Sequence, residues 1–149
     1  MIQRIQTLYL LAVTAITALM FFFPFINTEG LIVAFNYNGF EGIDGKLETP
    51  VYPLMVIIII CALVSFGSIF LFKNRILQIR LNIFNTALFF FIYCVVLGYF
   101  FTFKNDLEIT GSSLGVSFFF PAINLILTYL AIRSIGADEA MVRSLDRLR

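Results

Sequence analysis

Four long apolar runs dominate the chain, and most of its charged residues lie between them. The runs cover residues 7–26, 51–72, 81–103 and 114–132, and none of them contains a charged side chain. A helix needs about 20 mostly apolar residues to cross the hydrocarbon core of a bilayer. The pattern therefore predicts an all-α membrane protein, a four-transmembrane-helix bundle that forms a single domain over residues 1–149.

The first run begins like a signal peptide, because Arg4 precedes it and small residues follow. Its apolar character continues, however, through a series of bulky side chains: Met20, Phe21, Phe22, Phe23 and Phe25. Such a run is too long and too bulky for a cleavage region. We therefore expect an uncleaved first span.

The loops after the first and third runs are expected to form a small β-sheet cap. In the first of these loops, residues 31–35 favour a strand, and Asn38-Gly39 is a strong hairpin turn signal. In the second, residues 106–110 alternate between polar and apolar, which predicts a strand, and residues 111–113 suit a turn. We expect one antiparallel sheet with strands from both loops, and two flexible loops are the alternative.

Lys and Arg are distributed unequally between the two sides of the predicted bundle. The cap side, loops 27–50 and 104–113, carries only Lys46 and Lys104. The opposite side carries eight cations: Arg4, Lys73, Arg75, Arg80, Arg133, Arg143, Arg147 and Arg149. Because short cytoplasmic loops are enriched in Lys and Arg, both termini are expected to be cytoplasmic and the cap extracytoplasmic.

The cytoplasmic side is expected to hold little structure of its own. Gly136 suits a helix C-cap, and a short amphipathic helix is predicted over about 138–148. Basic side chains on this side could contact anionic lipid headgroups, at about 1 kcal/mol each. The candidates are Arg4, Lys73, Arg75, Arg80, Arg143 and Arg147. The alternative is that these cations only set the orientation.

Each run carries one stripe of small or polar residues at helical spacing. Along the chain, the stripes are Thr7, Thr14 and Ala18; Cys61, Ser65 and Ser68; Asn82, Thr86 and Tyr93; and Ser117, Pro121, Asn124 and Thr128. Membrane helices pack through such residues, so we expect the stripes to face inward. The polar residues expected in the bundle core are Asn124, Tyr93, Thr86, Ser117 and Ser65. We expect the Tyr93 hydroxyl to donate to the Asn124 amide oxygen. The alternative is that the stripes line a pathway for a polar substrate.

Composition adds several exclusions. The chain is 60% hydrophobic and 13% charged, against about 25% charged residues in soluble domains. A net charge of +1 gives no general attraction to nucleic acid. The chain has no histidine, so Ser-His and Cys-His nucleophile pairs cannot form. No metal-ligand spacing or nucleotide motif occurs, and we expect no enzyme activity and no cofactor.

Both ends of the chain carry distinctive sequences. The opening residues 1–11, MIQRIQTLYLL, and the closing residues 138–149, DEAMVRSLDRLR, resemble a family of small bacterial four-span membrane proteins. That family is known only as a domain of unknown function. The resemblance covers the whole chain and implies a location in the bacterial inner membrane. It implies no activity and no catalytic residues.

The small soluble mass and the ordered cap suit a non-enzymatic accessory or structural subunit that docks to a larger membrane assembly. Its expected partners are the lipid bilayer, anionic lipids and another membrane protein. The alternative is a small transporter or a lipid-binding membrane protein that uses the polar stripes or a lateral groove.

Overall fold

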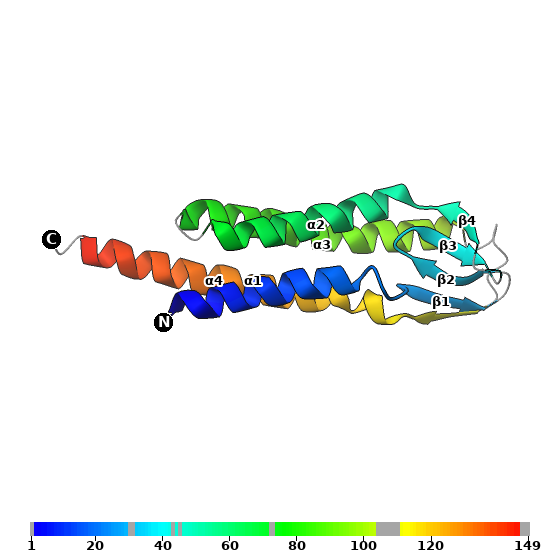
Figure 1. Cartoon of the computed structure of the whole chain (residues 1–149), viewed down its shortest axis with the longest axis horizontal. Coiled ribbons are helices and arrows are strands. Elements are labelled where there is room, and N and C mark those ends of the chain that lie inside the picture. The colour runs from blue at the N-terminus through cyan, green and yellow to red at the C-terminus, as the bar shows by residue number, and fades with distance from the viewer. Residues whose placement is uncertain are drawn as a thin grey trace.

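The computed structural model describes residues 2–29, 32–42, 44, 46–71, 74–103 and 111–146. Within them, the chain forms a long rod of helices with a β-sheet at one end, and both termini lie at the opposite end (Figure 1). The helices are α1 (Ile2–Leu19), α2 (Tyr52–Phe70), α3 (Arg75–Phe103) and α4 (Phe120–Asp146). α1 and α3 each pack against both α2 and α4, so the four helices form one bundle.

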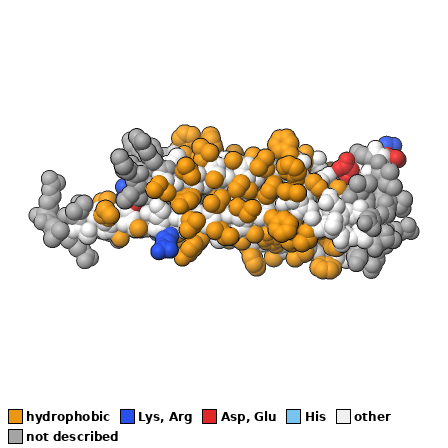
Figure 2. Space-filling model, turned by 90° about the horizontal axis from the view of Figure 1, so that it is seen from below, with side chains coloured by type: hydrophobic (Ala, Val, Ile, Leu, Met, Phe, Trp, Pro, Cys, Tyr) orange, Lys and Arg blue, Asp and Glu red, His pale blue; other side chains and the backbone are white. Residues whose placement is uncertain are grey.

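The outer surface of the bundle is strongly apolar. In Figure 2 hydrophobic side chains cover the helical middle, and Lys, Arg, Asp and Glu side chains show only toward the ends. Three described helices, over Tyr52–Phe70, Arg75–Thr102 and Val116–Val142, are long and apolar enough to cross a membrane. The apolar part of α1, Ile5–Leu19, is shorter. At about 1.5 Å per residue, α2 alone is about 28 Å long, close to the hydrocarbon thickness of a bilayer. These features indicate a membrane protein.

The first apolar run is helical over only part of its length. α1 ends at Leu19, and strand β1 (Ile26–Glu29) uses the end of the run. Pro24 prevents the helix from continuing to the end of the run, because it disfavours helical backbone at the residue before it. The backbone N–H groups of Met20, Phe21 and Phe22 each donate to the carbonyl three residues earlier, which closes the helix in a tight turn.

α4 corrects the prediction for the C-terminal segment. The helix runs without interruption through Gly136 to Asp146, so Gly136 is not a C-cap and no separate helix begins at residue 138. A glycine inside a helix costs about 1 kcal/mol relative to alanine. Tertiary contacts on both sides of Gly136 offset this cost, because Ile135 is buried and Asp138 forms an ion pair with Arg75 on α3.

The predicted small antiparallel sheet is confirmed. Its strands are β1, β2 (Ile32–Asn36), β3 (Gly39–Gly42), β4 (Leu47–Pro50) and β5 (Gly111–Leu114), in the spatial order β4-β3-β2-β1-β5. All pairings are antiparallel. β5 pairs with β1 where a turn was expected, so that turn prediction was wrong. The strand predicted over 106–110 lies outside the described residues.

The β2–β3 hairpin turns one residue earlier than predicted. Asn36 pairs with Gly39, which leaves Tyr37 and Asn38 as the two loop residues. Gly39 has φ 139°, a backbone conformation that favours glycine. The next pair, Phe35 and Phe40, is fully buried, with ring centroids 4.5 Å apart. This aromatic pair explains the register, because a shift by one residue would turn both rings away from the core.

The sheet is joined to the helices by a close backbone crossing. The Gly115 N–H donates to the Phe25 carbonyl (2.9 Å), and the Ser117 N–H donates to the Pro24 carbonyl (3.2 Å). The Ser117 hydroxyl also donates to the Phe23 carbonyl (2.7 Å). A Cβ at Gly115 would lie 2.3 Å from the Pro24 carbonyl oxygen, so this crossing requires glycine. The crossing connects the end of α1 to the start of α4.

Candidate functional site

Buried polar side chains connect α2 and α3 near the end of the bundle that is opposite the sheet. The Asn85 Nδ2 donates to the Ser65 hydroxyl (2.7 Å), and the Gln78 Nε2 donates to the Ser68 carbonyl (3.0 Å). The Ser68 hydroxyl donates to the Ser65 carbonyl (3.0 Å). All four side chains are almost completely buried. Membrane helices commonly associate through small residues and polar contacts of this kind.

α3 also carries polar side chains that bond to its own backbone. The Asn82 Nδ2 donates to the Gln78 carbonyl (2.9 Å), and the Thr86 hydroxyl donates to the Asn82 carbonyl (2.9 Å). Asn82 is fully buried, whereas Thr86 is half-buried. Thr86 therefore needs no partner on another helix, because a hydroxyl can bond the carbonyl one turn earlier.

A second set of polar contacts connects α1 and α4. The Asn124 Nδ2 donates to the Thr17 hydroxyl (3.0 Å), which donates to the Val13 carbonyl (2.7 Å). Asn124 and Thr17 are fully buried. Nearer the termini, the Gln6 Nε2 donates to the Ser134 carbonyl (3.2 Å). Among the α1 side chains that the structure describes, which begin at Ile5, the buried polar ones are Gln6 and Thr17.

The inward stripe expected for α1 was wrong. Thr7 and Ala18 are exposed, and Thr14 is half-buried. The Thr14 hydroxyl donates to the Leu10 carbonyl (2.8 Å), so it is satisfied within its own helix. The stripe on α2 (Cys61, Ser65 and Ser68) is fully buried, as are Ser117, Asn124 and Thr128 of the fourth stripe.

The predicted hydrogen bond from the Tyr93 hydroxyl to the Asn124 amide oxygen does not form. The Tyr93 hydroxyl donates to the Phe118 carbonyl (2.7 Å) and accepts from the Ala122 N–H (3.1 Å). These two backbone groups are four residues apart, so the hydroxyl sits between a donor and an acceptor that a regular helix would join directly. The expected pairing fails because the start of α4 has unpaired backbone groups closer to Tyr93, and Asn124 uses Thr17 instead.

Four buried oxygen atoms in the bundle have neither a hydrogen-bond partner nor an ion-pair partner among the described residues. They are the Oδ1 atoms of Asn82, Asn85 and Asn124 and the hydroxyl of Thr128. All four side chains are fully buried. Leaving such a group without a partner costs about 1–3 kcal/mol. We call the eight residues Thr17, Ser65, Ser68, Gln78, Asn82, Asn85, Asn124 and Thr128 the polar seam.

An ion pair lies at the end of the bundle that carries the termini. Arg75 of α3 and Asp138 of α4 approach to 3.0 Å, with side chains 18% and 11% exposed. Arg80 is exposed and lines a pocket of about 360 Å³ together with Asn74, Arg75, Ile76, Leu77 and Glu139. Of the predicted lipid contacts, Lys73 and Arg147 lie outside the described residues, as do the side chains of Arg4 and Arg143.

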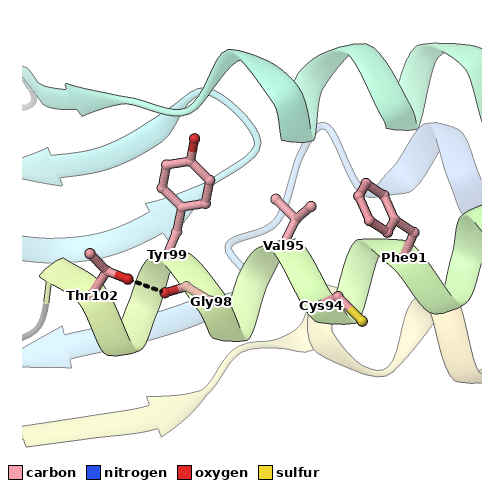
Figure 3. Close-up of a pocket in the computed structure, with 6 residues that line it drawn as sticks. All are labelled: Phe91, Cys94, Val95, Gly98, Tyr99 and Thr102. Carbon is pink, nitrogen blue, oxygen red and sulfur yellow. Dashed lines mark hydrogen bonds between the residues drawn. The ribbon is translucent and has the colours of Figure 1, made fainter.

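A groove follows the outer face of α3 toward the sheet. It has a volume of about 490 Å³ and is lined by Phe91, Cys94, Val95, Gly98, Tyr99 and Thr102, which we call the α3 groove. Figure 3 shows the larger side chains on one side of the helix and Cys94 on the other. The Thr102 hydroxyl donates to the Gly98 carbonyl (2.8 Å), so it is satisfied within its own helix.

A family model described as "Domain of unknown function (DUF4293)" matches residues 2–148. The chain belongs to this family. The match confirms the resemblance drawn from the two ends of the sequence. A search of curated proteins found no match.

Within the part of this DUF4293 chain that the structure describes, no three Cys, Asp or Glu side chains come together in a group that could hold a metal ion. Cys61 is buried, Cys94 is exposed, and both are free thiols. Thr17, Gln78 and Asn85 were not among the residues predicted for the bundle core. For the last two a signal was present, since residues 78, 82, 85 and 89 follow helical spacing and all four are buried.

Proposed function

We propose that the chain crosses the bacterial inner membrane four times, with both termini in the cytoplasm and the sheet outside. Two features support this. α1 packs beside α2 and α4 in the same bundle, although its apolar part is shorter. Both termini lie opposite the sheet, which fits an even number of crossings (Figure 1).

Cysteine labelling tests this orientation. In a variant with Cys61 and Cys94 replaced by alanine, Lys46→Cys reports on the sheet end and Asn74→Cys on the opposite end, and both positions are exposed. An impermeant maleimide should label position 46 in intact spheroplasts and position 74 only after permeabilisation. The reverse pattern would show that the orientation is inverted.

In this membrane, the chain acts as a non-enzymatic accessory subunit, which docks its α3 groove against a transmembrane helix of a larger assembly. The observation that carries this proposal is the small-residue face of the groove. Cys94, Gly98 and Thr102 follow one another at successive turns and are exposed. A Cβ at Gly98 would meet no atom within 4 Å. Small residues at this spacing let another helix approach closely.

Native mass spectrometry of the gently solubilised protein tests docking. A partner chain should co-purify with the native protein and be lost from Gly98→Leu, because the leucine fills the groove. Gly67→Leu on α2 is the matched control, since a Cβ there also meets nothing within 4 Å. Equal retention of the partner chain by both variants would exclude the α3 groove as the docking site. A homodimer that forms through the groove would contradict an accessory role.

Lipid binding is a second candidate function, favoured by the pocket around Arg80. Two arginines, Asn74 and Glu139 line it beside the apolar side chains of Ile76 and Leu77. Arg75 is already paired with Asp138, so Arg80 is the cation that would meet a lipid phosphate. In native mass spectrometry, an anionic lipid retained by the native protein should be lost from Arg80→Gln but kept by Arg133→Gln. The second variant is a control at another exposed cation. Equal retention by both variants would argue against this pocket.

A further inference from the structure

The interior of the bundle differs in polarity along its length. Toward the sheet it is apolar and aromatic, with fully buried Phe35, Phe40, Leu54, Ile58 and Ile92. Toward the termini, buried polar side chains replace these groups on α2, α3 and part of α4: Ser65, Ser68, Gln78, Asn82, Asn85 and Thr128. Thr17 and Asn124 lie nearer the sheet, at the end of α1 and the start of α4. Most of the polar seam therefore lies in the part of the bundle nearer the termini.

Flipping the side-chain amides of the seam cannot satisfy their unpaired oxygens. In Asn82, Asn85 and Asn124 the amide nitrogen already donates to a protein oxygen, and only the amide oxygen lacks a partner. Rotating any of these amides by 180° would leave the nitrogen unpaired instead. A donor from outside the protein would satisfy these three oxygens, in keeping with the rule that buried polar groups are almost always hydrogen-bonded.

Two of the unpaired oxygens lie at the same level on neighbouring helices. α3 and α4 are antiparallel, and their relative level is fixed at one end by Tyr93 with Ala122 and at the other by Arg75 with Asp138. Counting from these contacts places Asn85 of α3 opposite Thr128 of α4. One small molecule between the helices could accept from the Thr128 hydroxyl and donate to the Asn85 amide oxygen.

The chemistry of the seam favours a neutral molecule. Its eight residues are all uncharged. The nearest described carboxylate along α4 is that of Asp138, which is already paired with Arg75. A cation in a buried site without a carboxylate would lose its hydration without a compensating charge. Water, which donates and accepts equally, matches the three amide oxygens and the hydroxyl, and buried waters usually make two to four such bonds.

We propose that the polar seam binds a short file of water molecules that enters from the end of the bundle bearing the termini. The part-exposed Arg75–Asp138 pair and Gln78 stand at the entrance. The file stops at the apolar interior toward the sheet, where Ile58 and Ile92 are fully buried. The bundle therefore holds a hydrated half-path, closed on the sheet side.

Water-edited solid-state NMR of the full-length protein in lipid bilayers tests this proposal. The side-chain amides of Asn82, Asn85 and Asn124 should receive magnetisation from water several-fold faster than the backbone amides of Ile58 and Ile92. Thr128→Val, which keeps the shape of the side chain, should slow the transfer to Asn85 several-fold. The other NMR signals of the Thr128→Val protein should keep their chemical shifts, which would exclude misfolding as the cause.

Three results would overturn the proposal. Transfer to Asn85 as slow as transfer to Ile92 would mean that the seam is dry. Equally fast transfer to all of these positions would mean a continuous channel instead of a half-path. Shifts of the Asn82 and Asn85 signals when choline chloride replaces sodium chloride would mean that a cation, and not water, fills the site.

Discussion

Replacing Gly115 with alanine would place a methyl carbon inside the crossing between the end of α1 and the start of α4. The added Cβ would lie 2.3 Å from the Pro24 carbonyl oxygen and 2.9 Å from the Phe25 carbonyl carbon. Both atoms belong to the backbone, so no side-chain rotation can relieve the overlap. The two segments must move apart by roughly an ångström to restore ordinary van der Waals contact.

That movement would break the hydrogen bonds that hold the crossing. Three of them join residues 115–117 to residues 23–25, at 2.9, 3.2 and 2.7 Å. At about 1 kcal/mol for each hydrogen bond, Gly115→Ala should lower the free energy of unfolding by about 3 kcal/mol. The pairing of β5 with β1 should weaken with it, because β5 ends at Leu114, directly before the glycine.

Thermal unfolding in detergent, followed by size-exclusion chromatography, measures this effect. Gly67→Ala is the control, since its added Cβ meets nothing within 4 Å. In a helix interior that control should be neutral or stabilising, by up to about 1 kcal/mol. The two glycines should therefore give opposite results. A Gly115→Ala protein as stable as the native chain would refute the reasoning.

Three further predictions concern polar contacts between the helices. Tyr93→Phe should destabilise the bundle by about 1–2 kcal/mol, because it unpairs a carbonyl and an N–H at the start of α4. This cost should be the same in the Asn124→Leu background, and a non-zero coupling would show that the two side chains do meet. A cycle of Asn124→Leu with Thr17→Val should give a coupling of about 0.6 kcal/mol, the average for membrane helices, and zero would exclude their bond. In unfolding titrations, Asp138→Asn should cost more than the double variant with Arg75→Gln, because the single change leaves a part-buried charge unpaired, and the opposite order would argue against the pair.

The helices and the small sheet could be predicted because their signals are local. Apolar length identified α2 and α3, and β-favouring residues next to a glycine turn identified the β2–β3 hairpin. The hairpin position was one residue off because Asn38-Gly39 supplies its glycine to the start of β3, not to the loop. Gly136 was misread for a related reason, since the tertiary contacts that carry α4 past it are not visible in the local sequence.

The polar contacts were harder to predict, because each depends on the relative axial position of two helices. Ser65 was a candidate from its stripe, but its partner Asn85 was not, since nothing local links residues 20 positions apart. The inward face of α1 was misjudged because small and polar residues were taken as buried. Thr14 shows why this fails: a threonine can satisfy its hydroxyl within its own helix, so its polarity does not require an inward position.

The position of β5 late in the chain leaves one edge of β1 unpaired during part of protein synthesis. β1 and β2 are adjacent in the chain, but the other edge of β1 pairs with β5, which follows α3. During synthesis from the N-terminus, β1 therefore carries an open edge until residues 111–114 emerge. An unpaired strand edge readily pairs with other chains. A chain terminated prematurely after α3 would keep this edge open, and is expected to aggregate through the sheet even if its helices are intact.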